Sequence, residues 1–254
     1  MKTTPLLELK GVSKRFGAVQ ALTNVDFAVR AGEVMALVGD NGAGKSTLIK
    51  GVAGIYPFDE GETYFDGKRV TIHNPREATA LGIEIVYQDL ALADNLDVVA
   101  NMFLGREKTQ LIQLDEARME LAAIETLTSL SVSTLRSVRT LVAALSGGQR
   151  QAIAIAKAVL WNSRLVILDE PTAALGVAQT RQVLNLVRNL AAKGLGVVII
   201  SHNLHDVFEC SDRITVLRLG QKVGEFITAQ TTQQEVVHAI TAGTLQHVPG
   251  MKEI

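Results

Sequence analysis

The sequence predicts an α/β fold: a mainly parallel sheet with an antiparallel β layer at its edge and an inserted α-helical subdomain. Short, wholly apolar runs at residues 34–38, 165–168 and 197–200 alternate with predicted helices. Buried parallel strands covered by helices on both faces have this composition. Residues from about 94 to 160 hold little strand signal and read as mostly helical, which predicts the insertion.

The remaining elements follow in chain order. Residues 6–8 and 25–29 suggest half-exposed strands, and 61–67 suggests a turn-rich antiparallel region. A helix is expected from Asp115, because acidic residues favour the first turn of a helix. After Phe226 the chain becomes polar, and residues 231–234 are expected to begin one last short helix.

These elements indicate one domain over residues 1–254. Its core and antiparallel layer would comprise residues 1–90 and 160–225, and its helical subdomain residues 91–159, with residues 226–254 as a C-terminal tail.

Composition limits the class of partner. The chain has 254 residues, of which 47% are hydrophobic, and a formal net charge of -1. General binding to nucleic acid needs a strong basic excess, so no nucleic-acid partner is expected.

A glycine-rich segment at residues 39–47 directly follows the apolar run 34–38 and opens an apolar helix. This strand–loop–helix context is the one that the P-loop pattern requires. Glycines let the backbone wrap phosphate groups, and the backbone N–H groups at the helix start face the anion. Lys45 would add a positive charge at the β- and γ-phosphates of ATP, and Ser46 a hydroxyl for Mg²⁺. The nucleotide-binding residues expected here are Gly39, Asn41, Gly42, Ala43, Gly44, Lys45, Ser46 and Thr47.

Two acidic residues end the apolar run 165–168. In a P-loop protein, an acid at the tip of such a strand holds Mg²⁺, which assigns Asp169 as a metal ligand. Glu170 is then placed to polarise the attacking water as general base.

A third motif supplies a second glycine-rich helix start. Ser146 is a good N-cap for the helix that follows, and two glycines beside a helix N-terminus can grasp phosphate. The residues expected to contact nucleotide are Ser146, Gly147, Gly148 and Gln149.

With these three motifs the chain resembles the ABC ATPase family, whose own signature is Leu-Ser-Gly-Gly-Gln. The resemblance runs from about residue 6 to 224. It implies that Gln88 touches Mg²⁺ or the water, that His202 contacts the γ-phosphate, and that Phe16 stacks on adenine. Judged without the family, Gln88 would be a surface polar residue, His202 a satisfied strand-end histidine and Phe16 a core residue.

The resemblance also implies partners. Two copies would form a head-to-tail dimer, in which residues 146–149 of one copy close on the ATP held by the other. The segment just after Gln88 would dock a membrane permease, which places the protein peripherally at the cytoplasmic face of the inner membrane. An extracytoplasmic sugar-binding protein would be an indirect partner.

One position departs from the family, which usually carries an aspartate where this chain has Gly176. That departure, together with residues 87–92 and 101–106, resembles the importer branch for monosaccharides of the ribose, xylose or fructose type, in its single-cassette form.

Three alternatives remain: an ABC importer for another solute, a soluble ABC ATPase of DNA repair or translation, and a non-hydrolysing scaffold. A near-zero net charge and the lack of a heptad run oppose the soluble class, and the presence of Glu170 and His202 opposes the scaffold.

Overall fold

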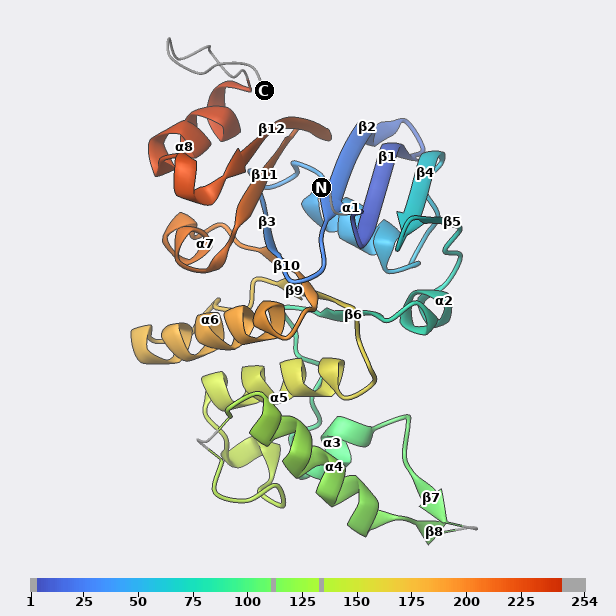
Figure 1. Ribbon diagram of the computed structural model, residues 1–254, viewed down its shortest axis with the longest axis vertical. Coiled ribbons are helices and arrows are strands. Elements are labelled where there is room, and N and C mark those ends of the chain that lie inside the picture. The colour runs from blue at the N-terminus through green and yellow to red at the C-terminus, as the bar shows by residue number, and fades with distance from the viewer. Residues whose placement is uncertain (1–3, 111–112, 133–134, 244–254) are drawn as a thin grey trace.

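The computed structural model describes residues 4–110, 113–132 and 135–243, and Figure 1 shows how their elements are arranged. The strands are β1 Leu7–Phe16, β2 Val19–Val29, β3 Val34–Val38, β4 Glu60–Phe65, β5 Lys68–Val70, β6 Ile83–Val86, β7 Thr109–Gln110, β8 Gln113–Leu114, β9 Leu165–Asp169, β10 Gly196–Ile200, β11 Arg213–Arg218 and β12 Gln221–Ile227. The α-helices are α1 Lys45–Val52, α2 Pro75–Ala80, α3 Val98–Phe103, α4 Glu116–Ser129, α5 Gly147–Val159, α6 Val177–Ala192, α7 Leu204–Cys210 and α8 Gln233–Ala242. Two 3₁₀ turns are η1 Val142–Ala144 and η2 Thr228–Gln230.

The central sheet has the strand order β12-β11-β3-β10-β9-β6, and only the edge strand β12 pairs antiparallel with its neighbour. This confirms the predicted mainly parallel sheet. Strand β3 is apolar throughout because both its faces are covered. Its residues Val34, Ala36 and Val38 join one hydrophobic cluster, and Met35 and Leu37 join the cluster on the other face. Alternation of side chains along a strand produces this division.

A second sheet, with strand order β2-β1-β4-β5, is antiparallel and forms the predicted β layer. In Figure 1 its strands lie beside α1 at the upper right. Leu9, Phe27 and Phe65 of this layer share a hydrophobic cluster with Leu48 of α1 and Leu37 of β3. The antiparallel layer and the central sheet are therefore held together by one apolar core.

The inserted region is mostly helical, as predicted. Figure 1 places α3, α4 and α5 below the central sheet. Phe103 of α3, Ala123 of α4 and Ile155 of α5 belong to the same cluster as one face of the sheet. The short hairpin β7–β8 departs from the expectation, because the two-residue strands leave no periodic pattern to read. The subdomain boundaries at 91 and 159 stay a prediction.

The last described helix, α8, begins after Thr232, as the polar sequence predicts. Thr232 and Glu235 cap each other: the Thr232 hydroxyl accepts from the Glu235 amide, and the Glu235 carboxylate accepts from the Thr232 amide. Residues 244–254 of the expected tail lie outside the described residues.

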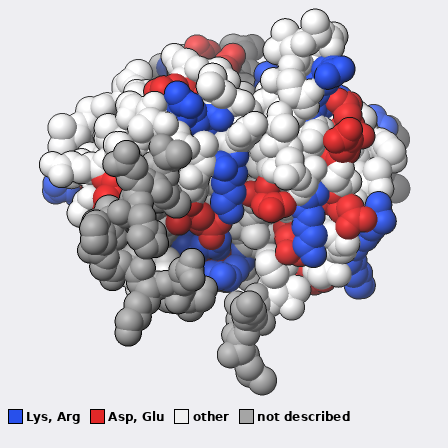
Figure 2. Space-filling model, turned by 90° about the horizontal axis from the view of Figure 1, so that it is seen from above, with Lys and Arg blue, Asp and Glu red and all other residues white. Residues whose placement is uncertain are grey.

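Every helix in the described part of the chain falls short of the length and apolarity that a bilayer span requires. On the face shown in Figure 2, Lys and Arg side chains lie among Asp and Glu side chains.

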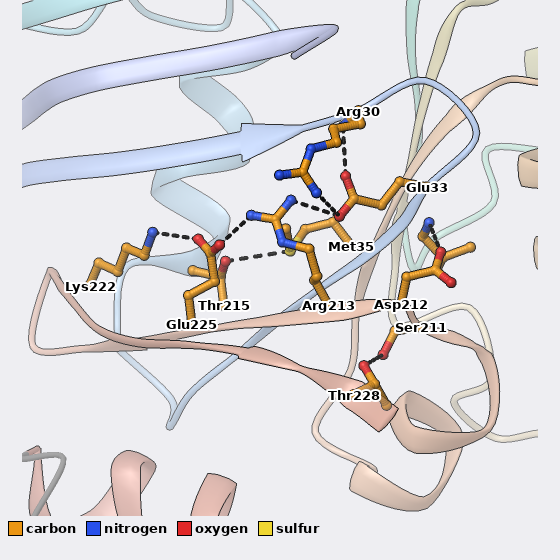
Figure 3. A network of polar contacts seen from close by, with 11 residues as sticks. Arg30, Glu33, Met35, Ser211, Asp212, Arg213, Thr215, Lys222, Glu225 and Thr228 are labelled. Atoms are coloured by element: carbon orange, nitrogen blue, oxygen red, sulfur yellow. Dashed lines mark hydrogen bonds and ion pairs between the residues drawn. The ribbon is translucent and has the colours of Figure 1, made fainter. Parts of the chain in front are cut away.

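A charged network ties together β3, β11 and β12 (Figure 3). Arg213 donates to Glu33, which lies next to β3, over 2.7 Å, and it also pairs with Glu225 of β12. Lys222 donates to Glu225 over 2.6 Å. Burial raises the pKa of Glu225, but the hydrogen bonds from Lys222 and Arg213 outweigh burial and hold that pKa below its usual value.

The network makes folding stability depend on pH. The pKa of Glu225 is lower in the folded protein than in the unfolded chain, where it is about 4.3. The carboxylate therefore stabilises the fold fully above the unfolded value, and that stabilisation is lost as the pH falls through the folded pKa. We expect the free energy of unfolding, measured in urea at pH 7, 5 and 3, to fall mainly between pH 5 and 3, and that of Glu225→Gln to fall less steeply over the same range. Glu60→Gln on exposed β4 is the control. Equal slopes for wild type and Glu225→Gln would contradict this reading.

Candidate functional site

The predicted site residues follow the carboxyl ends of the parallel strands and therefore lie at one edge of the sheet. Strand β3 leads into residues 39–47, β9 ends in Asp169, and β10 is followed by His202, with Gln88 just past β6. Because β6, β9, β10 and β3 are consecutive neighbours and parallel, their carboxyl ends meet at this edge. Ligands of open parallel sheets bind outside these ends.

The glycine-rich loop is pressed against its neighbours. Gly39 has φ 149°, and a β-carbon there would lie 2.1 Å from the carbonyl oxygen of Leu217 at the end of β11. Gly44 has φ 103°, and a β-carbon there would lie 2.8 Å from the Leu22 side chain on β2. Glycine is therefore required at both positions. Gly44 itself stands at the N-terminus of α1, where no side chain of the described residues caps the first amides.

Lys45 folds back over this loop. Its Nζ donates to the carbonyl oxygens of Gly39, at 2.6 Å, and of Asp40, at 3.0 Å. Burial lowers the pKa of Lys45, while the nearby carboxylates of Glu170, Asp40 and Asp169 partly oppose that shift. The ammonium group is thus half-buried beside the glycine-rich loop, where an anion would stabilise it.

The two predicted carboxylates differ in their surroundings. Burial raises the pKa of Asp169, and repulsion from Glu170 raises it further, against the attraction of Lys45 and Lys50. Glu170 is 16% exposed, and its Oε2 lies 2.9 Å from Nδ1 of His202, whose side chain is 75% exposed. The histidine and the acid are therefore already paired, with the histidine on the open side.

Two adjoining cavities bring most of the predicted residues together. The first, of about 650 Å³, is lined by residues 41–47, Gln88, Asp169 and Glu170. The second, of about 870 Å³, shares Asn41, Gln88 and Glu170 with the first and adds Gly39 and His202. Ser46, Gln88 and Asp169 therefore line a single cavity, together with Lys45.

Two sets of predicted residues lie elsewhere. Phe16 does not line either cavity. It is 46% exposed and packs edge-on against Tyr56 with ring centroids 5.1 Å apart. The Tyr56 hydroxyl donates to the Thr47 carbonyl over 3.1 Å, which ties this aromatic pair to the end of the phosphate loop. Sequence reasoning missed Tyr56, because no motif marks it.

The signature segment stands at the start of α5 and is absent from the lining of both cavities. Ser146 caps α5 as predicted: its hydroxyl accepts from the Gln149 amide, and the Gln149 side chain accepts from the Ser146 amide. A β-carbon on Gly147 would lie 3.0 Å from Leu175, just before α6. Residues 146–149 therefore pack at the start of α6, away from the glycine-rich loop at residues 39–47 of the same chain.

Known proteins are similar to this chain in sequence. A family model described as ABC transporter matches residues 22–173. The chain is 45% identical over 243 residues to the xylose/arabinose import ATP-binding protein of Sulfolobus acidocaldarius, an alignment covering 96% of each. It is 44% identical over 248 residues to the fructose import ATP-binding protein of Rhizobium meliloti, covering 95% of each.

Among solved structures, the chain is similar to a dimeric, post-hydrolysis state of an ATP-binding cassette bound to ADP and Pi. The TM-score is 0.72 and the sequence identity 27%, over 87% of this chain and 98% of that one.

Proposed function

Because the chain belongs to the ABC transporter family of ATPases, we propose that it is the subunit that couples ATP hydrolysis to import of a monosaccharide through a separate permease. The observation that carries the proposal is the single edge at which Lys45, Gln88, Asp169 and Glu170 share one cavity. The sugars named for the xylose/arabinose and fructose relatives, which align over nearly their whole length, support the substrate class.

In this proposal the phosphate loop holds the triphosphate of ATP. Gly39 and Gly44 keep the backbone close enough for its N–H groups to donate to phosphate oxygens, and the uncapped start of α1 adds further donors. Lys45 would exchange its two carbonyl partners for the β- and γ-phosphates. That exchange is favourable because an anion neutralises a partly buried ammonium group.

The donor set also suits Mg²⁺. Ser46, Gln88 and Asp169 offer a hydroxyl, an amide and a carboxylate oxygen to one cavity, and Mg²⁺ is usually bound by one or two carboxylates together with substrate phosphates. When bound, the ion would neutralise charge that develops on the phosphates. The described residues contain no cluster of three or more His, Cys, Asp and Glu, so a cage made by the protein alone is not found there.

Hydrolysis would start at Glu170. Its carboxylate takes a proton from a water as the water oxygen forms a bond to the γ-phosphorus. The bond from that phosphorus to the bridging oxygen breaks, and its electron pair leaves with ADP. His202, 2.9 Å from Glu170 Oε2, would orient the carboxylate and reach the γ-phosphate from the open side.

Glu170→Gln tests this assignment. The amide keeps the shape of the side chain but cannot accept the proton, so we expect turnover to fall by about 10²-fold or more. The affinity for ATP should stay within about twofold, because the phosphate contacts come from residues 39–47. Steady-state phosphate release and equilibrium binding of ATP measure the two quantities, with Glu116→Gln on α4 as control. Turnover at the wild-type rate would refute Glu170 as the base.

The position of Ser146 and its neighbours supports a dimer. Within one chain the signature segment does not reach the loop that would hold ATP, whereas a second copy arranged head to tail would bring its own segment there. The related cassette with ADP and Pi is dimeric. We place residues 146–149 of each copy over the ATP of the other. At Gly176, beside this segment, the chain lacks the acid that the family usually carries.

A groove next to Gln88 suits the permease. This cavity, of about 290 Å³, is lined by Tyr87, Asp89, Leu104, Lys157 and Trp161 among others. Tyr87 and Leu104 each expose more than a third of their surface, so the groove offers apolar contact area to a partner. A permease segment docked here would contact the residues on both sides of Gln88 and so reach the hydrolysis site. The subunit would then lie at the cytoplasmic face of the membrane, and the permease would receive its sugar from an extracytoplasmic binding protein.

Co-purification tests the transport proposal. A tagged chain extracted from native membranes in mild detergent should bring down a multispanning permease and a sugar-binding protein, both identified by mass spectrometry. Lys157→Glu should weaken this recovery at least about tenfold, because it places a charge of opposite sign in the docking groove. Ser163→Ala, outside the groove lining, is the matched control. Recovery of soluble partners alone, such as ribosomal or DNA-repair proteins, would overturn the transport proposal and leave the ATPase standing.

A further inference from the structure

The loop that follows β9 is held in an unfavourable backbone conformation. Glu170 has φ 51° and Ala174 has φ 60°. In this left-handed region a β-carbon crowds the backbone, so residues other than glycine stay there only where the surroundings hold them. The general base is thus the first residue of a strained turn, and something must fix that turn.

Backbone hydrogen bonds supply part of the restraint. The Glu170 amide donates to the Ile200 carbonyl of β10 over 2.9 Å. The Ala173 amide donates to the Glu170 carbonyl over 3.1 Å, and the Leu175 amide to the Thr172 carbonyl over 3.2 Å. Only the first of these three bonds connects the turn to another element, so the backbone alone leaves the far side of the turn unanchored.

A buried side-chain pair provides that anchor. The Thr172 hydroxyl donates to Oδ2 of Asp206 on α7 over 2.6 Å. Thr172 is 8% exposed and Asp206 2% exposed. In the parts of the chain that are described, no second side chain donates a hydrogen bond to this carboxylate. A short bond to a buried carboxylate is among the stronger hydrogen bonds in proteins, and losing its donor leaves the acceptor unsatisfied.

The hydrogen bond between Thr172 and Asp206 connects the same two segments as the contact between Glu170 and His202, namely the turn after β9 and the segment after β10. Thr172 lies two residues after Glu170, and Asp206 lies four residues after His202. On the open side, Glu170 Oε2 is 2.9 Å from His202 Nδ1. Two contacts therefore join the turn after β9 to the segment after β10, one exposed and one buried.

We propose that Thr172 and Asp206 are a positioning pair, which sets the distance between Glu170 and His202 for the hydrolysis step. The inference rests on the proposed role of Glu170. The pair touches neither the phosphate loop nor the cavities that hold the other site residues. It acts through Glu170, so its loss should slow turnover and leave ATP binding unchanged, whereas a purely structural pair would change folding stability alone.

The test compares Thr172→Val with Thr172→Ser in the full chain. Valine keeps the shape of threonine and removes the hydroxyl, and serine keeps the hydroxyl. We expect Thr172→Val to lower kcat about tenfold or more with KM for ATP within twofold, and Thr172→Ser to stay within about threefold of wild type. Equal kcat for Thr172→Val and wild type, or equal loss in both variants, would overturn the proposal.

A second arm covers poor folding of Thr172→Val. Asp206→Asn keeps an oxygen that accepts the bond but removes the charge, and it should lower kcat severalfold with KM unchanged. A fall in kcat that is matched by a rise in KM would overturn the proposal, because it would show a general disturbance of the site.

Glu170→Gln separates this inference from the proposed function. A positioning pair has no effect on hydrolysis once the base is absent. Adding Thr172→Val or Asp206→Asn to the Glu170→Gln variant should therefore change its residual turnover by less than twofold. Labelled ATP measures this low turnover. A further loss equal to that in wild type would overturn the positioning role. If Glu170→Gln itself turned over ATP normally, the assignment of the base would fail as well.

Discussion

The contact between the Gly39 backbone and the Leu217 carbonyl fixes where the phosphate loop can lie. No side chain fits between them, so the loop rests directly on the end of β11. The parallel pairing of β11, β3, β10 and β9 then determines where the other site residues appear. Because these strands share a direction, the loop on the end of β11 lies at the same edge of the sheet as Asp169, which ends β9, and Glu170, which follows it. The site is therefore a consequence of sheet topology as much as of its motifs.

The charged side chains of Lys45 and Asp169 are partly buried, which is unfavourable, and a bound ligand of opposite charge would reduce that cost. Lys45 is partly stripped of water and satisfied by two backbone carbonyls. Asp169 is half-buried, and both this burial and the neighbouring Glu170 carboxylate raise its pKa. A phosphate would stabilise the lysine, and a divalent cation would stabilise the aspartate. Polar groups held in this way need little rearrangement when the nucleotide arrives, and preorganisation of this kind is a major source of catalysis.

Much of this arrangement could be predicted from sequence, because its signals are local. The apolar run at 34–38, the glycines at 39–44 and the acids at 169 and 170 each lie within a few residues of one another. Features made by distant residues were not predictable. Tyr56 reaches Thr47 only in the folded chain, and Thr172 meets Asp206 across 34 positions. The β7–β8 hairpin was missed because two-residue strands show no alternation. The proposed roles of Phe16 and of residues 146–149 involve a bound nucleotide and a second copy, and a single chain contains neither.

The central claim is that two copies complete each other's sites, and complementation in a mixed dimer tests it most directly. Chains carrying Lys45→Ala and chains carrying Ser146→Arg are co-expressed with different tags, and dimers that hold both tags are purified. Each variant alone should be nearly inactive. In the mixed dimer one site carries both changes and the other neither, so ATP turnover should recover to as much as about half that of wild type. A mixed dimer as inactive as its parents would contradict the claim, since it would mean that each chain needs its own signature segment beside its own phosphate loop.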